Sequence, residues 1–308
     1  MPLHPEAQTF LGLVADSPPL DTLSVSQIRE GEAQGIPLTG ASVPMWSVAD
    51  TSICDVPVRV FRPYHALAAA VVYFHGGGWV TGSVDLADTT ARDIAMHSGA
   101  TVISVGYRKA PEHPFPAAID DALAVTRSLL DGATDLAVDP RLVAVAGDSS
   151  GGNLAAVVAQ QLAGHHQPLR YQVLVYPVLD ATMSSQSYQD FGQGHYLTRR
   201  DMQFYVHSYA SHVDPRDPRL SPGLNPDVSG VAPATIITAE CDPLRDEGES
   251  YAAALLSAGV QVNCVRFLGQ VHPFLYFPAV MRAAHAARRF IGSELRAAFE
   301  TGDEEATD

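Results

Sequence analysis

Positive charge is scarce in this chain, and lysine is almost absent. The 308 residues carry 19 Lys and Arg against 34 Asp and Glu, which gives a net charge of −15. Nucleic acid and anionic membrane surfaces repel so acidic a protein, so we expect neither as a partner. Lys109 is the one lysine, and its neighbours Arg108 and Pro111 argue against a lysine base or Schiff-base mechanism.

Cysteine and long apolar runs are also scarce. Cys54, Cys241 and Cys264 form no C-x-x-C pair, so the sequence predicts neither a metal site nor a disulfide framework. Scattered cysteines fit a reducing compartment, and we expect a cytoplasmic protein. No apolar run approaches the ~20 residues that span a bilayer, and the N-terminus does not resemble a signal peptide, so we expect no stable membrane insertion.

The most informative stretch that is present is Gly147-Asp148-Ser149-Ser150-Gly151. It lies between a predicted buried strand at 142–146 and a predicted helix at 153–163. A serine at such a corner, with glycine two places before and two after, is the nucleophile-elbow pattern. Only residues without a Cβ fit where strand and helix nearly touch, and the tight turn pushes the hydroxyl outward. The offsets select Ser149 over Ser150 as nucleophile. The alternative is a glycine-rich turn that merely lets a helix pack on a sheet.

Strand and helix patterns alternate along most of the chain, and this order predicts the fold class. We expect strands at 42–48, 56–62, 69–74, 101–107, 142–146, 171–176, 234–239 and 260–267. We expect helices at 5–14, 25–34, 86–97, 115–130, 153–163, 244–257 and 278–299. The result is an α/β fold with a mostly parallel central sheet, helices on both faces, and the carboxyl ends of the strands along one edge. Such sheets bind ligands at that edge.

The alternation breaks after residue 179 in a polar and aromatic segment. A structureless loop of that length would be unusual in a compact domain, so we expect an inserted helical cap. Within it, a helix at 197–209 has Thr198 as a plausible N-cap. The expected domains are N-terminal cap helices at 1–40, a core at 41–180 and 226–300, a cap insertion at 181–225, and a disordered acidic tail at 301–308.

An attacking serine also needs donors for the developing oxyanion. Gly77 and Gly78 follow a predicted strand, in the run His75-Gly-Gly-Gly-Trp79, and their backbone N–H groups have no side chain to keep an oxyanion away. A phosphate-binding loop is the alternative, but G-x-G-x-x-G and G-K-[ST] are absent here. We interpret His75 as a structural hydrogen-bonding residue, because it lies at the strand end ahead of the loop.

His272 is the expected base and Asp242 the expected acid. Both lie just beyond predicted strands, and they follow Ser149 in the order serine, acid, histidine. Asp242 also precedes a proline, a pair that is typical of a helix N-cap. One carboxylate can serve both as the triad acid and as the N-cap through different oxygens. Glu240 and Asp246 are rivals for the acid. Asp246, one turn into the helix, should point away from the strand edge.

Four motifs, taken in order, resemble the hormone-sensitive-lipase-like branch of the α/β-hydrolases, the bacterial family IV esterases. They lie at 75–79, 107–118, 147–152 and 242–248, with a partial fifth around His272, so the resemblance spans about residues 40–295. It implies an α/β-hydrolase fold with a helical cap and the triad Ser149, Asp242 and His272. It also implies an oxyanion hole made by the N–H groups of Gly77, Gly78 and Ser150.

The chain departs from the family pattern at two positions. Ser150 stands where alanine is usual, which keeps the N–H and adds a hydroxyl that could shift acyl preference. Pro273 stands where glycine is commoner, and it biases His272 towards an extended backbone.

The expected activity is that of a cofactor-free serine carboxylesterase acting on short- to medium-chain acyl esters through an acyl-enzyme. Its partner would be a small-molecule ester, and the edge strand at 260–267 favours pairing into a homodimer. A lactonase, deacetylase or amidase on the same triad is the first alternative. The second is a non-catalytic receptor. The plant gibberellin receptors resemble this family but lack the catalytic histidine.

Overall fold

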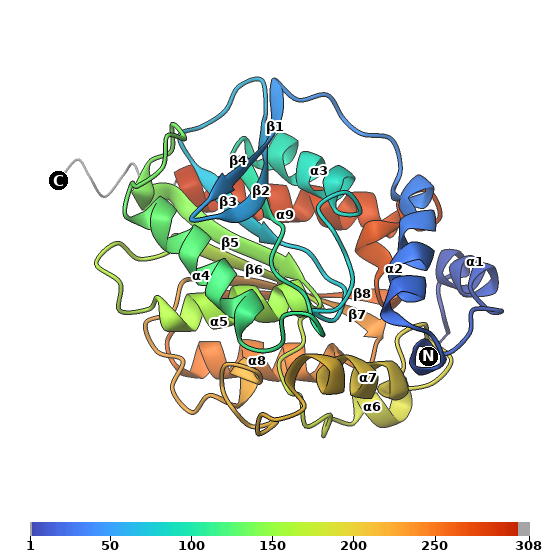
Figure 1. Cartoon of the computed structure of the whole chain (residues 1–308). Helices are drawn as coiled ribbons and strands as arrows, with labels where there is room; N and C mark the ends of the chain where they lie inside the picture. The colour runs from blue at the N-terminus through green and yellow to red at the C-terminus, as the bar shows by residue number, and fades with distance from the viewer. Residues whose placement is uncertain (1, 301–308) are drawn as a thin grey trace.

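The computed structural model describes residues 2–300, and across them one eight-stranded sheet runs through the middle of the molecule (Figure 1). The strands are β1 (Ser47–Ile53), β2 (Val56–Arg62), β3 (Ala70–Phe74), β4 (Thr101–Val105), β5 (Val143–Asp148), β6 (Tyr171–Val175), β7 (Ala234–Cys241) and β8 (Val262–Val271). The helices are α1 (Pro5–Leu13), α2 (Val25–Gln34), α3 (Asp88–Ser98), α4 (Ala117–Leu130), α5 (Ser150–Gln161), α6 (Ser187–Asp190), α7 (Arg199–Ala210), α8 (Arg245–Ser257) and α9 (Ala283–Glu300). Short 3₁₀ turns include η1 (Leu20–Thr22) and η5 (Phe274–Tyr276).

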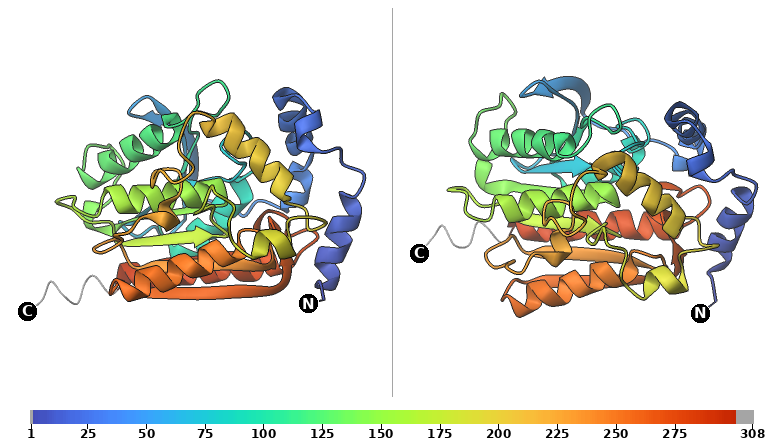
Figure 2. Two further views of the ribbon diagram at one scale, coloured as in Figure 1. Left: turned by 90° about the horizontal axis from the view of Figure 1, so that it is seen from below. Right: turned by 60° about the horizontal axis from the view of Figure 1, so that its bottom comes forward.

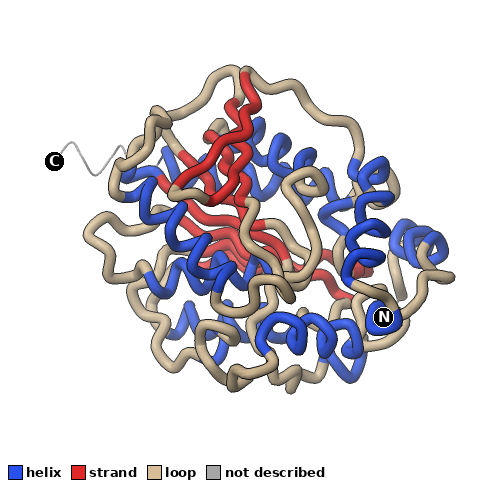
Figure 3. The backbone as a smooth tube through the Cα atoms, viewed as in Figure 1, coloured by secondary structure: helices blue, strands red, loops and turns tan. Residues whose placement is uncertain are grey.

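The sheet has the order β1-β2-β4-β3-β5-β6-β7-β8 and is parallel from β4 to β8. Its two faces pack against different helices (Figure 3). Successive residues of β5 show this: Val143 and Val145 join the core with α4, α5 and α8, whereas Ala144 and Ala146 join the core with α3 and α9. A strand covered on both faces needs apolar residues at every position. The predicted mostly parallel sheet with helices on both faces is therefore confirmed.

The strand predicted at 42–48 is wrong, because β1 begins only at Ser47. It forms a hairpin with β2 through Cys54 and Asp55, both at positive φ, so the strand must lie directly before that turn. Every residue of β1 except Ile53 is exposed, so the strand carries no apolar pattern that the sequence could reveal. The last helix also begins later than predicted, at Ala283.

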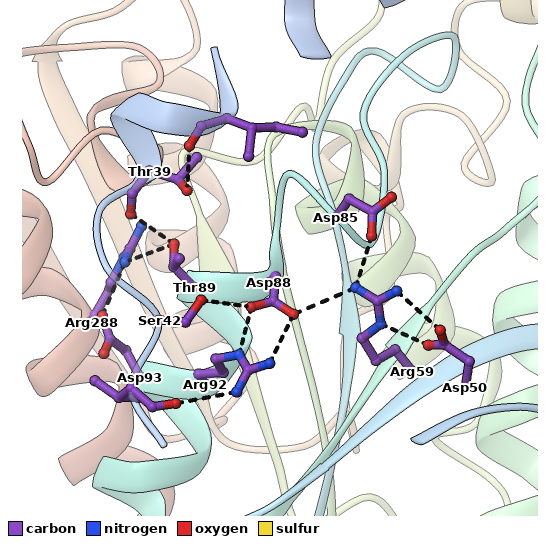
Figure 4. Close-up of polar contacts among 12 residues, drawn as sticks. Thr39, Ser42, Asp50, Arg59, Asp85, Asp88, Thr89, Arg92, Asp93 and Arg288 are labelled. Atoms are coloured by element: carbon purple, nitrogen blue, oxygen red, sulfur yellow. Dashed lines mark hydrogen bonds and ion pairs between the residues drawn. The ribbon is translucent and has the colours of Figure 1, made fainter. Parts of the chain in front are cut away.

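Arg59 links the β1–β2 hairpin to the body of the molecule (Figure 4). Its guanidinium lies 2.7 Å from Asp50 on β1, 2.8 Å from Asp85 and 3.5 Å from Asp88 on α3. Asp88 in turn accepts from Arg92, one turn further along α3. We call these five residues the Arg59 cluster. It lies partly in solvent, since Asp50 and Asp85 are 70% and 64% exposed.

The N-terminal helices and the inserted segment lie side by side beyond the carboxyl ends of the strands (Figure 2). Arg200 of α7 pairs with Asp21 of η1 at 2.7 Å, and the rings of Phe10 and Tyr196 are 5.2 Å apart. Thr198 caps α7, as predicted, by accepting from the Asp201 N–H. The acidic tail predicted at 301–308 lies outside the described residues. Among residues 2–300, no helix combines the length and apolarity required to cross a bilayer.

Candidate functional site

The turn between β5 and α5 has the close backbone contacts that the elbow pattern predicts. A Cβ on Gly147 would lie 2.2 Å from the Gly151 carbonyl oxygen, and one on Gly151 would lie 2.0 Å from the Phe74 carbonyl oxygen. Ser149 has φ 55° and ψ −120°, a strained conformation for a residue with a Cβ. The two glycines let strand and helix touch, and the strained turn holds Ser149 at the corner.

Ser149, His272 and Asp242 come together at the carboxyl edge of the sheet. The Ser149 Oγ lies 3.0 Å from His272 Nε2, and His272 Nδ1 lies 2.8 Å from Asp242 Oδ2. All three residues are buried, with exposed fractions of 8%, 4% and 0%. When Nδ1 carries the proton and donates it to Asp242, the Nε2 lone pair faces the serine hydroxyl. In that tautomer the imidazole can accept the hydroxyl proton.

Asp242 uses both of its carboxylate oxygens. While Oδ2 meets His272, Oδ1 accepts from the Leu244 N–H at 2.9 Å in the turn before α8, whose N-cap is Leu244 and not Asp242 as expected. The rival carboxylates are bonded elsewhere. Glu240 accepts from the Gly269 N–H at 2.7 Å, and Asp246 accepts from the Ser187 N–H of the insertion at 2.8 Å.

Two residues that were not predicted from the sequence, Tyr176 and Arg288, contact the loop that carries His272. The ring of Tyr176, directly after β6, lies 4.4 Å from the imidazole, centroid to centroid. Arg288 of α9 is buried, donates to the Leu275 carbonyl at 3.0 Å, and pairs with Asp93 of α3. The Tyr176 ring contacts the imidazole directly, and Arg288 holds the segment that follows Pro273. Nothing local in the sequence links them to His272.

Gly77 and Gly78 stand beside the elbow with free backbone N–H groups. Within the described part of the chain no acceptor bonds to the N–H of Gly77, Gly78 or Ser150. Gly77 and Gly78 both have positive φ, 118° and 58°, and a Cβ on Gly78 would meet the Tyr205 ring of α7 at 2.2 Å. Three N–H donors without an acceptor in the described residues, two of them on glycines with little room for a Cβ, suit a developing oxyanion.

His75 does not face the serine, which agrees with a structural role. Its Nδ1 lies 2.7 Å from the Gly76 carbonyl oxygen, and its own carbonyl accepts from the Tyr107 hydroxyl at 2.7 Å. Burial lowers the pKa of His75 to about 3, so the ring is neutral and donates one N–H. A bond to the Gly76 carbonyl polarises the peptide group that contains the Gly77 N–H.

Asp148 is a second carboxylate at this site, and its contacts were not predicted from the sequence. Its Oδ1 accepts from the Tyr73 hydroxyl at 2.7 Å, the Tyr276 hydroxyl at 2.8 Å and the Gly76 N–H at 3.0 Å. Burial raises its pKa to about 6, against the lowering effect of the two tyrosine hydrogen bonds. Asp148 therefore links three segments through one oxygen: the elbow at 147–151, the loop at 75–82, which we call the glycine loop, and the segment after His272. The signal in the sequence that could have identified Asp148 was its position directly before Ser149 in the elbow motif.

One group of side chains within residues 2–300 has the spacing of metal ligands, but it is far from Ser149. Asp131, His165 and His166 place one ligand atom each within 4.8 Å of the others. They follow the carboxyl ends of α4 and α5, whereas Ser149 lies at the amino end of α5.

Comparisons with known proteins agree with this fold. A family model described as the α/β hydrolase fold matches residues 71–276. An ethyl acetate hydrolase of Pseudomonas putida is 38% identical over 303 residues, covering 92% of this chain and 95% of its own. The carboxylesterase NlhH of Mycobacterium tuberculosis is 38% identical over 301 residues, covering 92% and 93%.

Solved structures superpose closely on the whole chain. A thermostable esterase from Pseudomonas putida gives a TM-score of 0.91 at 32% identity, covering 97% of this chain and 98% of its own. A hyperthermophilic esterase from Pyrobaculum calidifontis gives a TM-score of 0.89 at 37% identity, covering 96% and 99%. The chain therefore belongs to the hormone-sensitive-lipase-like esterase family of the α/β hydrolases.

Proposed function

We propose that this chain is a serine carboxylesterase that hydrolyses short- to medium-chain acyl esters through an acyl-enzyme. The observation that carries the proposal is the unbroken hydrogen-bonded line from Asp242 through His272 to Ser149, with distances of 2.8 Å and 3.0 Å. The free amides of Gly77, Gly78 and Ser150 beside it support the same chemistry. The printed activities of the relatives, an ethyl acetate hydrolase and a carboxylesterase, point to esters as the substrate class.

In the first half of the reaction, Ser149 becomes acylated. His272 Nε2 takes the hydroxyl proton as Oγ attacks the ester carbonyl, and Asp242 stabilises the imidazolium that results. The Gly77, Gly78 and Ser150 amides receive the carbonyl oxygen as it gains negative charge. Each such donor can contribute about 3 kcal/mol to the transition state. The tetrahedral intermediate collapses when His272 returns its proton to the leaving alcohol.

In the second half, water replaces the alcohol. His272 Nε2 removes a proton from the water, the hydroxide attacks the acyl-enzyme carbonyl, and the same amides hold the second oxyanion. Collapse of this intermediate breaks the bond to Oγ, which takes its proton back from His272, and the carboxylic acid leaves. The cycle converts one ester and one water into an alcohol and a carboxylic acid, and it returns Ser149 and His272 to their starting protonation states.

The surroundings of the triad suggest how a substrate is covered. We assign residues 1–40 and 181–225 to the cap, because α1, α2, α6 and α7 lie beyond the carboxyl ends of the strands. Ser149 lies at the same edge of the sheet and is 8% exposed. The free state of Cys54, Cys241 and Cys264 fits a cytoplasmic enzyme. The edge strand β8 remains our candidate for homodimer pairing.

Replacement of the nucleophile tests the proposal. Ser149→Ala should lower kcat for p-nitrophenyl butyrate by about six orders of magnitude, as in other triad enzymes. The matched control is Ser257→Ala, an exposed serine on α8 that bonds only to its own helix. A panel of acyl chain lengths, a lactone and an anilide separates esterase from lactonase and amidase. Wild-type activity in the Ser149→Ala protein would end the assignment.

A further inference from the structure

Helix α2 forms hydrogen bonds with three consecutive residues of the glycine loop, Val80, Thr81 and Gly82. Arg29 Nε donates to the Val80 carbonyl at 2.9 Å. Glu32, one turn further along α2, accepts from the Thr81 hydroxyl at 2.6 Å through Oε1 and from the Gly82 N–H at 2.7 Å through Oε2. Both carboxylate oxygens of Glu32 are therefore committed to a loop about 50 residues away in sequence.

Thr81, which donates to Glu32, is also bonded to the peptide group between Gly77 and Gly78. The Thr81 N–H donates to the Gly77 carbonyl at 2.8 Å, the Thr81 hydroxyl lies 3.0 Å from the same oxygen, and the Val80 N–H lies at 3.1 Å. That carbonyl belongs to the peptide group that carries the Gly78 N–H. Donors on the carbonyl fix the plane of this group and polarise its N–H towards an oxyanion.

Charged groups surround the contact between Glu32 and the glycine loop. Burial raises the pKa of Glu32 above its ordinary value, although the Thr81 and Gly82 bonds and the nearby charges of Lys109 and Arg29 oppose that rise. Lys109 donates to the Gly82 carbonyl at 2.6 Å, so both polar groups of Gly82 are bound to charged side chains. Charge-assisted bonds of this kind are shorter and stronger than neutral ones.

The opposite side of the loop meets the other part of the cap. The Tyr205 ring of α7 occupies the space that a Gly78 side chain would need. The glycine loop is therefore held between α2 and α7, and both helices lie outside the sheet. Both cap segments therefore contact the loop that carries the Gly77 and Gly78 amides.

From this arrangement we propose that Glu32 is a positioning residue that makes the oxyanion hole depend on the docking of α2. It acts through Thr81 on the peptide group of Gly78 and touches no reacting atom. The inference rests on the proposed function. It extends that function by naming the contact through which α2 sets the amide donors in place.

The test compares Glu32→Gln with Glu30→Gln, an exposed glutamate on the same helix that bonds only to Ser26. Each protein is titrated with a fluorophosphonate so that kcat is expressed per reactive Ser149. Glu32→Gln should lower kcat for p-nitrophenyl butyrate about tenfold and change KM less than about threefold. It should weaken a trifluoromethyl ketone inhibitor, whose adduct carries an oxyanion, by the same factor as kcat/KM.

A merely structural role for Glu32 predicts a different result: fewer titratable sites and a lower Tm, with kcat per site and inhibitor affinity unchanged. That result, or equal behaviour of Glu32→Gln and Glu30→Gln, overturns the inference. Should Glu32→Gln fail to fold, Thr81→Val and Thr81→Ser decide. Valine should reproduce the tenfold loss, serine should restore most of it, and equal kcat values in the two would refute the proposal.

Failure of the proposed function has its own signature in the same experiment. A wild-type protein that hydrolyses no ester and leaves Ser149 unlabelled contradicts the esterase assignment itself. An active, Ser149-dependent wild type with an unaffected Glu32→Gln variant removes the inference alone.

Discussion

Two polar networks in this molecule differ in burial. The buried one joins Ser149, His272 and Asp242 by hydrogen bonds, with Asp148 next to Ser149 in the chain, and none of the four residues is more than 8% exposed. The Arg59 cluster joins a surface hairpin to α3, and its Asp50 is 70% exposed. Water can replace a lost partner in the cluster but not in the buried network. The first network should therefore control activity and stability steeply, and the second only weakly.

The largest effect that separates the networks is expected at Asp242. Asp242→Asn removes the charge that stabilises the imidazolium and upsets the His272 tautomer, so kcat should fall about 10⁴-fold. Asp246→Asn is the matched control, four residues along, and should change kcat less than about threefold since its bonds go to the insertion and to Arg245. Steady-state kinetics on a p-nitrophenyl ester measure both. Equal losses in the two variants would show that the acid is misassigned.

The next effect concerns the backbone that carries the buried network. Gly151→Ala places a Cβ 2.0 Å from the Phe74 carbonyl oxygen, so strand and helix must separate. The free energy of unfolding should fall by about 3 kcal/mol or more. Gly12→Ala on α1, where nothing lies within 4 Å, should be neutral or stabilising by up to about 1 kcal/mol. Urea unfolding compares the two, and an unchanged midpoint for Gly151→Ala would contradict the contact.

The elbow is also the part of the site that the sequence predicts best. Gly147, Ser149 and Gly151 lie within five residues, so their steric requirement is readable without a structure. Asp242 and His272 were found in the same way, because short polar loops after apolar strands have a local pattern. The parallel strands were predictable for a related reason, since burial on both faces demands continuous apolar residues.

What the sequence could not reveal depends on partners far apart in the chain. Asp148 meets Tyr276 across 128 residues, and no local pattern announces that contact. Glu32 looks like any other glutamate on a polar helix until the fold brings Thr81 to it. The strand β1 was misplaced because its stability comes from the hairpin turn and the pairing with β2, and not from burial of its own side chains.

A smaller effect, dependent on pH, should appear at Asp148. Its pKa of about 6 lies above the ordinary 3.8, so the folded protein binds this proton more tightly than the unfolded chain. Its contribution to stability is present below pH 3.8 and is lost as the pH rises through about 6. Asp148→Asn does not titrate. Relative to wild type, its free energy of unfolding should rise by about 3 kcal/mol between about pH 4 and 7. Parallel stability profiles for the two proteins would refute a raised pKa.

The smallest effect is expected in the Arg59 cluster. Asp50→Asn removes an exposed partner of Arg59, and water takes its place, so the free energy of unfolding should change by less than about 0.5 kcal/mol. The difference should shrink further in about 1 M salt, which screens exposed charges. Urea unfolding at low and high salt measures it. A loss of several kcal/mol, comparable with Gly151→Ala, would show that exposure does not separate the two networks as described.

The site of covalent labelling tests the central claim most directly. One equivalent of a fluorophosphonate should add once per chain, and peptide mapping should place the adduct on the Oγ of Ser149. The Ser149→Ala protein should remain unlabelled, and His272→Ala should react far more slowly. An adduct on any other residue, or undiminished labelling of Ser149→Ala, would contradict the account.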